Sequence, residues 1–398
     1  MKKKILTILL VVNSILYSQQ KILFDATKAE TANNADWVID SDLFNVKYSH
    51  GNITFNGNES NPQRFPTPDQ STVTSTTTED YWTGGLSAWG IESVQQGWQV
   101  ETLPIGQQIT YGDSQNEQDL SNYDVFVVCE PNQLFTNDEK TALLNFVYNG
   151  GNLFMISDHN NSDRDGDGYD SVDVWNDFLN NNSTGGNPFG LQVNEDNIRE
   201  ASTNIAPLNN NEILHGTFGD VTSIEFYNGA TFSIDQTENF SVTGLVFRDN
   251  VSTTGLDQIM VASVEYGQGK VLAVGDSSIV DDGSGDPNDH LYDGWISDAN
   301  GNHRRLIMNA MEWMLNSTNA ILTNADNQNL KVYAHKNEIH INAKGNYLLK
   351  LYDLSGREIL QREIEQTQSF VLPYKGIIFY RLLQNNFLVK VGKLALTN

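Results

Sequence analysis

Residues 123–159 constrain the fold more than any other part of the chain, because they read as strand, helix and strand in succession. "YDVFVVCEPN" is a nearly continuous apolar run of the kind that is buried on both faces of a sheet. "FTNDEKTALLNFVYNGG" has helical apolar spacing, a capping-box pair in Thr136 and Glu139, and two closing glycines. "NLFMISDH" then reads as a second strand. This order predicts two parallel strands with the helix across one face of the sheet.

The same alternation extends over most of the chain before residue 317. Further strands and helices are predicted, in chain order, at 21–27, 77–97, 98–104, 258–267, 269–278 and 302–315. A polar stretch from about 190 to 260 is rich in β-forming residues. We therefore predict an α/β domain over residues 19–316, with three layers, a mostly parallel sheet and a β-rich insertion.

The first 18 residues have the layout of a secretory signal peptide. Lys2, Lys3 and Lys4 precede an apolar stretch, and small and polar residues follow around Ser18. That stretch is too short for a membrane span, and no later segment is long and apolar enough for one. We expect export with cleavage near Ser18, and no transmembrane segment in the mature chain.

Charge divides the remainder into two modules. Residues 19–329 carry 11 Lys/Arg against 45 Asp/Glu, whereas residues 330–398 carry 10 against 5. The acidity of the first module disfavours nucleic acid as a partner, because phosphates would be repelled. Cys129 is the only cysteine, so no intramolecular disulfide can form. Stability must come from a large core or from bound metal.

The segment after the acidic module has its own pattern. Residues 317–329 read as a polar linker. Residues 330–398 read as short alternating strands with turns at Ser355-Gly356, Lys375-Gly376 and Asn385-Asn386, which predicts a small C-terminal β-sandwich.

Two resemblances add to this interpretation. Residues 123–159, followed by "GKVLAVGDSS" and a terminal helix, resemble the class I glutamine amidotransferase-like superfamily, which implies a flavodoxin-like fold. True amidotransferases carry a cysteine nucleophile in the turn after the second strand of this stretch. Here Ser157, Asp158 and His159 occupy that turn, and Cys129 lies one strand earlier. The resemblance therefore does not imply amidotransferase activity.

The tail resembles the type A C-terminal sorting domain of type IX secretion substrates in "LYDLSGRE", "GIIFYRL" and "VKVGKLAL". The usual Pro-Asn-Pro near the domain start is missing, since the chain reads "VYAHKNEIHI" there. The resemblance implies the type IX secretion machinery as a partner and passage through the periplasm and across the outer membrane. Tail removal would then leave the protein secreted or at the cell surface.

Ligands of open α/β sheets bind at the carboxyl ends of the parallel strands. The predicted strands place Asp25, Cys129-Glu130, Asp158-His159 and Asp276-Ser277 at those ends, and the last helix brings His303 toward them. We predict Asp158, His159, Asp276, Ser277 and His303 as catalytic residues. The aspartates would hold a second divalent metal or act as base, and the histidines would ligate it or carry protons. A structural polar network of caps and turns is the alternative.

"SDHNNSDRDGDGYDS" (157–171) contains the first half of an EF-hand-type loop. Its twelfth position is Val174 instead of glutamate, so another carboxylate would have to substitute. We predict a structural Ca²⁺, against a solvated turn, with ligands from Asp163, Asp165, Asp167, Tyr169, Asp170 and Asp173.

Together these features predict a secreted, metal-assisted or acid–base hydrolase that acts on an extracellular glycan or ester. A serine hydrolase with Ser277 as nucleophile and His303 or His290 as base is a further alternative, although the chain has no G-x-S-x-G elbow. The rival from another class is a non-catalytic, calcium-stabilised surface module that binds glycan or protein. It is favoured by the missing nucleophile, since no complete catalytic motif replaces it.

Overall fold

The computed structural model describes residues 19–33, 35–40, 46–49, 52–55, 69–284, 292–298, 301–316, 331–353, 357–384 and 387–397. The expected signal peptide and linker, His290, and the expected turns at Ser355-Gly356 and Asn385-Asn386 lie outside these residues. Within the described part of the chain, no helix has the length and apolar character that a membrane span requires.

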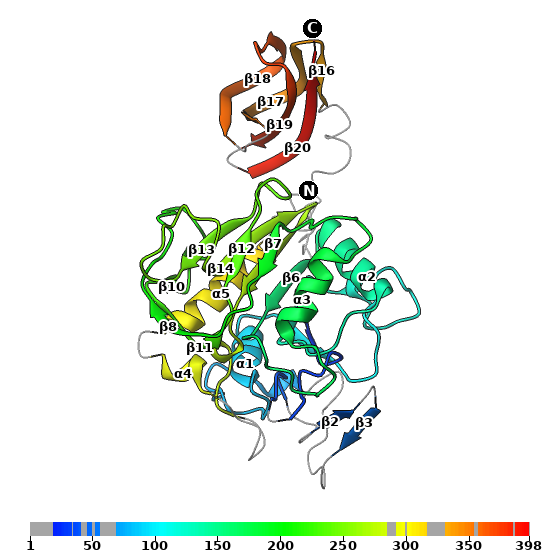
Figure 1. Cartoon of the computed structure of the whole chain (residues 1–398), viewed down its shortest axis with the longest axis vertical. Helices are drawn as coiled ribbons and strands as arrows, with labels where there is room; N and C mark the ends of the chain where they lie inside the picture. The colour runs from blue at the N-terminus through cyan, green and yellow to red at the C-terminus, as the bar shows by residue number, and fades with distance from the viewer. Residues whose placement is uncertain are drawn as a thin grey trace, which may run out of the picture.

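A mixed nine-stranded sheet forms the centre of the larger module (Figure 1). Its five parallel strands lie in the order β4 (Gln99–Leu103), β1 (Lys21–Asp25), β5 (Val125–Cys129), β6 (Asn152–Ile156) and β15 (Gly269–Val274). The sheet continues in antiparallel fashion through β14 (Ile259–Tyr266), β12 (Phe232–Ile234) and β7 (Leu191–Val193), with β13 (Thr243–Phe247) paired to β14. The carboxyl ends of the parallel strands therefore meet at one edge.

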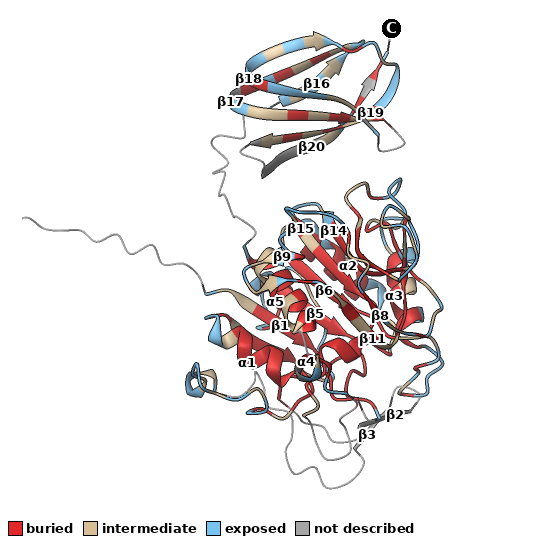
Figure 2. Ribbon diagram, turned by 90° about the vertical axis from the view of Figure 1, so that its left-hand side faces the viewer, coloured by how far each residue is buried: buried red, intermediate tan, exposed pale blue. Residues whose placement is uncertain are grey.

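Helices cover both faces of this sheet (Figure 2). On one face, Glu92 of α1 (Ser87–Gln95) forms an ion pair with Arg304 of α5 (Asn302–Leu315). On the other, Lys140 of α2 (Asn137–Tyr148) pairs with Asp177 of α3 (Ser171–Asn180). The module is thus a mixed α/β arrangement, as the sequence predicted, with α2 capped by the expected Thr136 and Glu139 box.

Large aromatic side chains fix the helices to the sheet. Trp89 of α1 packs edge-on against Phe24 of β1 and Phe154 of β6, at centroid distances of 5.2 and 4.8 Å. On the opposite face, Trp175 of α3 donates its indole N–H to the carbonyl of Ile156, the last residue of β6, at 2.9 Å. Contacts of this kind contribute burial energy and specific geometry. They hold the end of β6 at a defined place beside the carboxyl edge.

Two helices differ from the sequence prediction. The helix predicted over 77–97 begins only at Ser87, because Gly84 and Gly85 lie against the backbone of the loop before them. A Cβ at Gly84 would lie 2.0 Å from the carbonyl oxygen of Val38. Helix α3 was not predicted at all, since its N-cap, Asp170, had been assigned to the calcium loop.

The larger module also contains several smaller elements. These are the ribbons β2 (Val46–Ser49) with β3 (Asn52–Phe55), β8 (Ile198–Ser202) with β11 (Ile224–Gly229), and β9 (His215–Gly216) with β10 (Gly219–Asp220), the short helix α4 (Gly294–Ser297), and three 3-10 turns at Gln70–Thr72, Leu120–Asn122 and Ser277–Ile279.

The tail forms one five-stranded antiparallel sheet, nearly closed on itself, from β16 (Lys331–His335), β17 (Glu338–Tyr352), β18 (Glu358–Val371), β19 (Gly376–Gln384) and β20 (Phe387–Leu396). The β-sandwich that the sequence predicts stays a prediction, and the structure shows one curved antiparallel sheet. The long strand β17 pairs with β18 along its whole length and, on its other edge, with β16 and then β19, so a single curved sheet encloses the core. That core, which includes Ile339, Leu351 and Ile378, shares no residue with the core of the larger module.

Candidate functional site

Buried carboxyl groups gather at the carboxyl edge of the parallel strands. Asp25 ends β1, Glu130 follows β5, Asp158 follows β6 by two residues, and Asp276 follows β15 by two. All four side chains are at most 3% exposed. The sequence therefore placed the acidic edge correctly. The number of buried acids means that protons, hydrogen bonds or cations must balance their charge.

Glu130 lies at the centre of this edge. Its φ is 50°, in the left-handed region that a non-glycine residue enters only at an energetic cost. The indole of Trp37 and the hydroxyl of Ser277 each donate a hydrogen bond to Oε2 at 2.8 Å. The guanidinium of Arg164 contacts both oxygens, with its Nη2 3.2 Å from Oε2. The sequence located Glu130 at a strand end but assigned it no role.

Arg164 comes from the acidic loop after β6 and was not predicted as a site residue. Besides Glu130 it contacts Asp158, with Nη2 3.5 Å from Oδ2. Asn132 fixes its backbone, because the Asn132 side chain accepts from the Arg164 N–H at 2.8 Å and donates to the Glu130 carbonyl at 2.9 Å. A positive charge thus already lies between the two carboxyls.

The predicted second metal site is not assembled. Among the residues that the structure describes, three or more potential ligand atoms converge within 4.8 Å only at Asp163, Asp165 and Asp167. The predicted set of Asp158, His159, Asp276 and His303 does not converge in this way.

Burial raises the pKa values of both Asp158 and Asp276. Burial, followed by the negative charges of Glu130 and Asp276, raises the pKa of Asp158 well above its ordinary value, and Arg164 only partly opposes this. Burial raises the pKa of Asp276 to about 6, against the hydrogen bonds from Ser278 and from the Tyr227 N–H. Both buried carboxyl groups therefore favour the protonated form more than an exposed aspartate does.

His159 lies half-buried beside Asp158. Its Nδ1 is 2.7 Å from the carbonyl oxygen of Asn160. The carbonyl accepts whereas the Asn197 amide nitrogen, 3.1 Å from the same Nδ1, donates, so these two neighbours favour opposite tautomers of the ring. The other ring nitrogen, Nε2, is 3.9 Å from Oδ2 of Asp158. An imidazole nitrogen and a buried carboxyl group whose pKa is raised thus lie close together.

His303 differs from its predicted role. Its Nδ1 is 2.9 Å from the Gly294 carbonyl, and its Nε2 accepts from the Glu225 N–H at 3.1 Å. Main-chain groups therefore use both ring nitrogens, and burial lowers the pKa of this imidazole. His303 joins α5 to α4 and β11 as a neutral structural side chain. Ser277 donates its hydroxyl to Glu130, so the predicted pairing of Ser277 with His303 is not formed.

The acidic loop retains three of its six predicted calcium ligands as a convergent set. Ligand atoms of Asp163, Asp165 and Asp167 lie within 4.8 Å of one another. Burial, with Asp167 nearby, raises the pKa of Asp165 to about 6. The side chain of Asp170 makes other contacts. It accepts a hydrogen bond from the Asp173 N–H, which caps the start of α3, and another from the Asn161 N–H. Asp173 belongs to the first turn of α3, and the side chain of Tyr169 is exposed.

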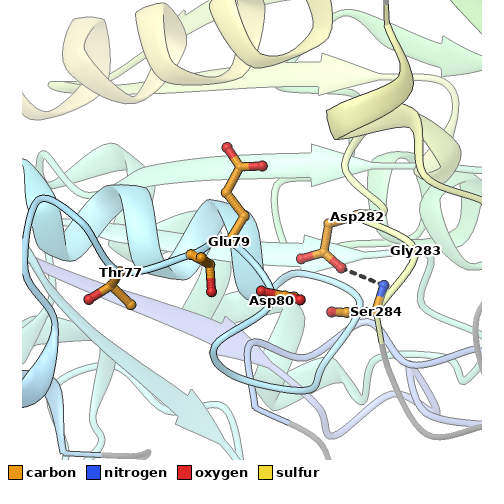
Figure 3. Close-up of a pocket in the computed structure, with 7 residues that line it drawn as sticks. Thr77, Glu79, Asp80, Asp282, Gly283 and Ser284 are labelled. Atoms are coloured by element: carbon orange, nitrogen blue, oxygen red, sulfur yellow. Dashed lines mark hydrogen bonds between the residues drawn. The ribbon is translucent and has the colours of Figure 1, made fainter.

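An open cavity of about 650 Å³ lies beside the same edge, where α1 begins (Figure 3). It is lined by Thr77, Thr78, Glu79, Asp80, Asp282, Gly283 and Ser284. Asp282 accepts hydrogen bonds from the Ala88 N–H in the first turn of α1 and from the Ser284 N–H at 2.8 Å. Burial raises its pKa to about 6 despite these donors. The cavity wall is therefore acidic and rich in hydroxyls.

Comparison with known proteins finds similar solved structures, all at low sequence identity. No protein-family model matches the chain, and no curated protein matches it. The "mmIFT52 N-terminal domain" is similar in structure at 14% identity and a TM-score of 0.42, covering 74% of this chain and 97% of that one. Cytoplasmic protein STM3548 from Salmonella typhimurium has 12% identity and a TM-score of 0.40, covering 74% and 98%. A β-galactosidase from Bacillus circulans sp. alkalophilus has 10% identity and a TM-score of 0.31, covering 74% of this chain and 37% of that one. Likeness at this level carries no functional argument.

Proposed function

We propose that this protein is a secreted hydrolase that cleaves an extracellular glycan or ester by acid–base chemistry at the carboxyl edge of its sheet. The observation that carries the proposal is the pairing of Asp158 and His159. The first is a buried acid whose pKa is raised, and the second is a half-buried imidazole whose Nε2 lies 3.9 Å away. A buried carboxyl group with a raised pKa beside an imidazole is typical of acid–base sites.

The pair supports a balanced hydrolytic cycle. His159 Nε2 takes a proton from a water molecule, whose oxygen forms the new bond to the substrate carbon. Asp158 gives its proton to the leaving oxygen as the old bond breaks. His159 then returns a proton to Asp158 across the gap between them, which restores the starting state. Arg164 holds the cluster together by contacting Glu130 and Asp158 at once.

The spacing of the pair favours an ester bond. Cleavage of a glycosidic bond uses carboxyl groups about 5 Å apart or more, on opposite sides of the sugar. The 3.9 Å between His159 and Asp158 is shorter than that. In an ester, the attacking water and the leaving oxygen are bonded to the same carbon in the intermediate, so a close acid and base can serve both.

The scaffold we propose is flavodoxin-like and related to the amidotransferase-like superfamily. The order of the parallel strands supports this, because numbered along the chain it is 2-1-3-4-5. In such sheets ligands bind between the first and third strands, where Asp25 and Glu130 lie here. Cys129 is buried and burial raises the pKa of its thiol, so it is a poor nucleophile.

Variants of the acid–base pair test the proposal. Asp158→Asn and His159→Gln should each reduce hydrolysis of p-nitrophenyl esters, assayed with p-nitrophenyl glycosides in parallel, by at least about a hundredfold. Asp138→Asn, on the exposed start of α2, is the matched control and should behave as wild type. If wild type cleaves neither class, or both variants keep full activity, the enzyme assignment is wrong. The protein is then the surface-binding module, which the structural roles of Ser277 and His303 favour.

We also propose a structural Ca²⁺ bound by Asp163, Asp165 and Asp167, because their carboxylates converge next to the loop residue Arg164. Chelation should lower the melting temperature of wild type but not of the triple alanine variant. Equal shifts in both proteins would remove the calcium assignment.

Export through the type IX machinery, with residues 330–398 as the sorting signal, is part of the same proposal. Its support is the resemblance of the tail sequence, which forms a separate core. Deleting residues 330–398 should leave the protein in the periplasm, and surface exposure of the truncated chain would contradict this.

A further inference from the structure

Two tyrosines form a stacked aromatic surface beside the acid–base pair. We infer that this surface binds a sugar ring, so that the substrate is an ester carried on a neutral glycan. The inference rests on the proposed hydrolysis and names its substrate class. The rings of Tyr227 and Tyr292 lie 5.4 Å apart at an interplanar angle of 29°. Tyr292 is 37% exposed, so the stack is open to a ligand.

The carboxyl edge itself builds this surface. The backbone N–H of Tyr227 donates to Asp276, and that of Tyr292 donates to Oδ2 of Asp281 at 2.8 Å. Gly229 permits the close approach, since a Cβ there would lie 2.7 Å from the Cβ of Asp276. Buried carboxylates therefore hold both tyrosines in place before any ligand arrives, which lowers the entropic cost of binding.

A chain of amide contacts links the surface to the catalytic pair. Asn197 Nδ2 lies 3.1 Å from His159 Nδ1, and Asn228 donates to the Asn197 side chain at 2.7 Å. Asn228 directly follows Tyr227, at an irregularity of β11 where its φ is 103°. A ligand stacked on the tyrosines would thus have its edge toward His159, with amide groups between.

The chemistry of these groups matches a carbohydrate. An aromatic face packs against the apolar C–H face of a pyranose, and side-chain amides exchange hydrogen bonds with its hydroxyls. Asn197 is exposed and Asn228 is partly so. The tyrosines would pack against the sugar ring, and the asparagines would orient the sugar through hydrogen bonds to its hydroxyls.

Charge points to a neutral sugar. The chain has a net charge of −26, which repels an anionic polymer at long range. The guanidinium of Arg164 contacts Glu130 and Asp158, so it is not available to a uronic acid. Arg199 lies over the Tyr227 ring at 5.3 Å. The reacting group is then an acyl ester on the sugar, in keeping with the 3.9 Å acid–base spacing.

A second tyrosine pair provides the matched control. Tyr148 and Tyr266 lie 5.5 Å apart at 61°, and Tyr148 is 55% exposed at the end of α2. Tyr148 lies at the C-terminal end of its helix, and none of the contacts described above links it to the acid–base pair. Tyr148→Ala removes as much exposed ring without touching the carboxyl edge.

The experiment uses the full chain, with native gels containing acetylated xylan or acetylated glucomannan and with acetate release from both polymers. Wild type should be retarded by at least one polymer and release acetate from it. Tyr292→Ala should bind roughly tenfold more weakly and raise KM for acetate release more than it lowers kcat. Tyr292→Phe keeps the ring and should restore binding, whereas Tyr148→Ala should match wild type.

The outcomes separate this inference from the proposed function. If neither polymer retards wild type, or if Tyr292→Ala is retarded as strongly as wild type, there is no sugar site on the tyrosines. If p-nitrophenyl acetate is hydrolysed but no acetate leaves either polymer, the acylated-glycan assignment is wrong while the hydrolase stands. If retardation depends on Tyr292 and nothing is hydrolysed, the hydrolase is wrong while the sugar site stands.

Discussion

Replacing Asp25 with asparagine should stabilise the protein at alkaline pH. Asp25 Oδ1 accepts from the Thr27 N–H at 3.0 Å, and Glu30 Oε2 accepts from the Lys28 N–H at 2.6 Å. The remaining oxygens, Asp25 Oδ2 and Glu30 Oε1, are buried without a donor. The ammonium of Lys28 pairs with Glu139 at 2.7 Å and only partly opposes the rise in the pKa of Asp25. Two acids are therefore buried together, and the charge of Asp25 raises the pKa of Glu30.

The structure gives the sign and the size of the effect. Burial raises the pKa of Asp25 from about 3.8 to about 6, and burial together with Asp25 raises that of Glu30 further. The native state thus binds the proton more tightly than the unfolded state. The stability that proton binding at Asp25 contributes is complete below about pH 4 and is lost as the pH rises through about 6. A shift of about two pKa units corresponds to ~3 kcal/mol.

Urea unfolding at pH 4.5 and pH 8, followed by tryptophan fluorescence, measures this contribution. All seven tryptophans lie before residue 317, so the signal reports the larger module alone. Asp25→Asn keeps the acceptor for Thr27 and adds a donor for Glu30. Its advantage over wild type should therefore grow by ~2 kcal/mol between the two pH values, because about a third of the full effect is already lost at pH 4.5. Asp138→Asn should show no such growth. If Asp25→Asn and wild type lose equal stability from pH 4.5 to 8, the buried pair does not set the pH dependence.

Three further outcomes are expected. Arg164→Met leaves the buried Glu130 carboxylate without its cation and should lower the free energy of unfolding by about 3–5 kcal/mol. The control Arg248→Met breaks a partly exposed ion pair and should lower it by less than about 1 kcal/mol. Equal losses would show that Glu130 does not need its guanidinium. Cys129 should resist thiol reagents in the native protein, since it is buried and its thiol pKa is raised, and rapid labelling without denaturant would refute this. Thr136→Ala removes the capping box of α2 and should cost about 1 kcal/mol in urea melts, so an unchanged midpoint would contradict the cap.

Elements with strong local signals could be predicted from the sequence. The cap of α2 needs only Thr136 and Glu139, three residues apart, and the structure confirms it. Helix α5 has the predicted bounds, 302–315, because an apolar face recurs along it without interruption. The strands β5 and β6 are almost wholly apolar, which leaves them no solvent-exposed arrangement. In each case the physical cause lies within a few residues along the chain.

Elements shaped by distant contacts could not be predicted in this way. The late start of α1 depends on Gly84 meeting the backbone at Val38, a contact between separate loops. Asp170 suits both a calcium loop and a helix cap, and only the fold decides between them. The alternating pattern of the tail is equally compatible with two sheets and with one curved sheet. Its long strand β17 changes partners along its length, and that pairing decides.

The candidate site also combines features that the local sequence predicts with charges whose balance depends on distant contacts. Strand ends located the acids, but their roles depend on how the guanidinium of Arg164 is shared among them. It contacts both oxygens of Glu130 and reaches Asp158 only at 3.5 Å. Asp158 is therefore incompletely neutralised and its pKa is raised, which suits it to the acid role that we propose. Had Arg164 faced Asp158 with both donors, that carboxyl would be ionised and His159 would have no acid to exchange with. The side chains that set this balance lie up to 147 residues apart along the chain, in the case of Glu130 and Ser277, and Glu130 meets them from a left-handed backbone conformation. The sequence pattern of an acid after a strand is identical whether the acid receives the arginine or not, so the chemistry of this edge follows from its geometry.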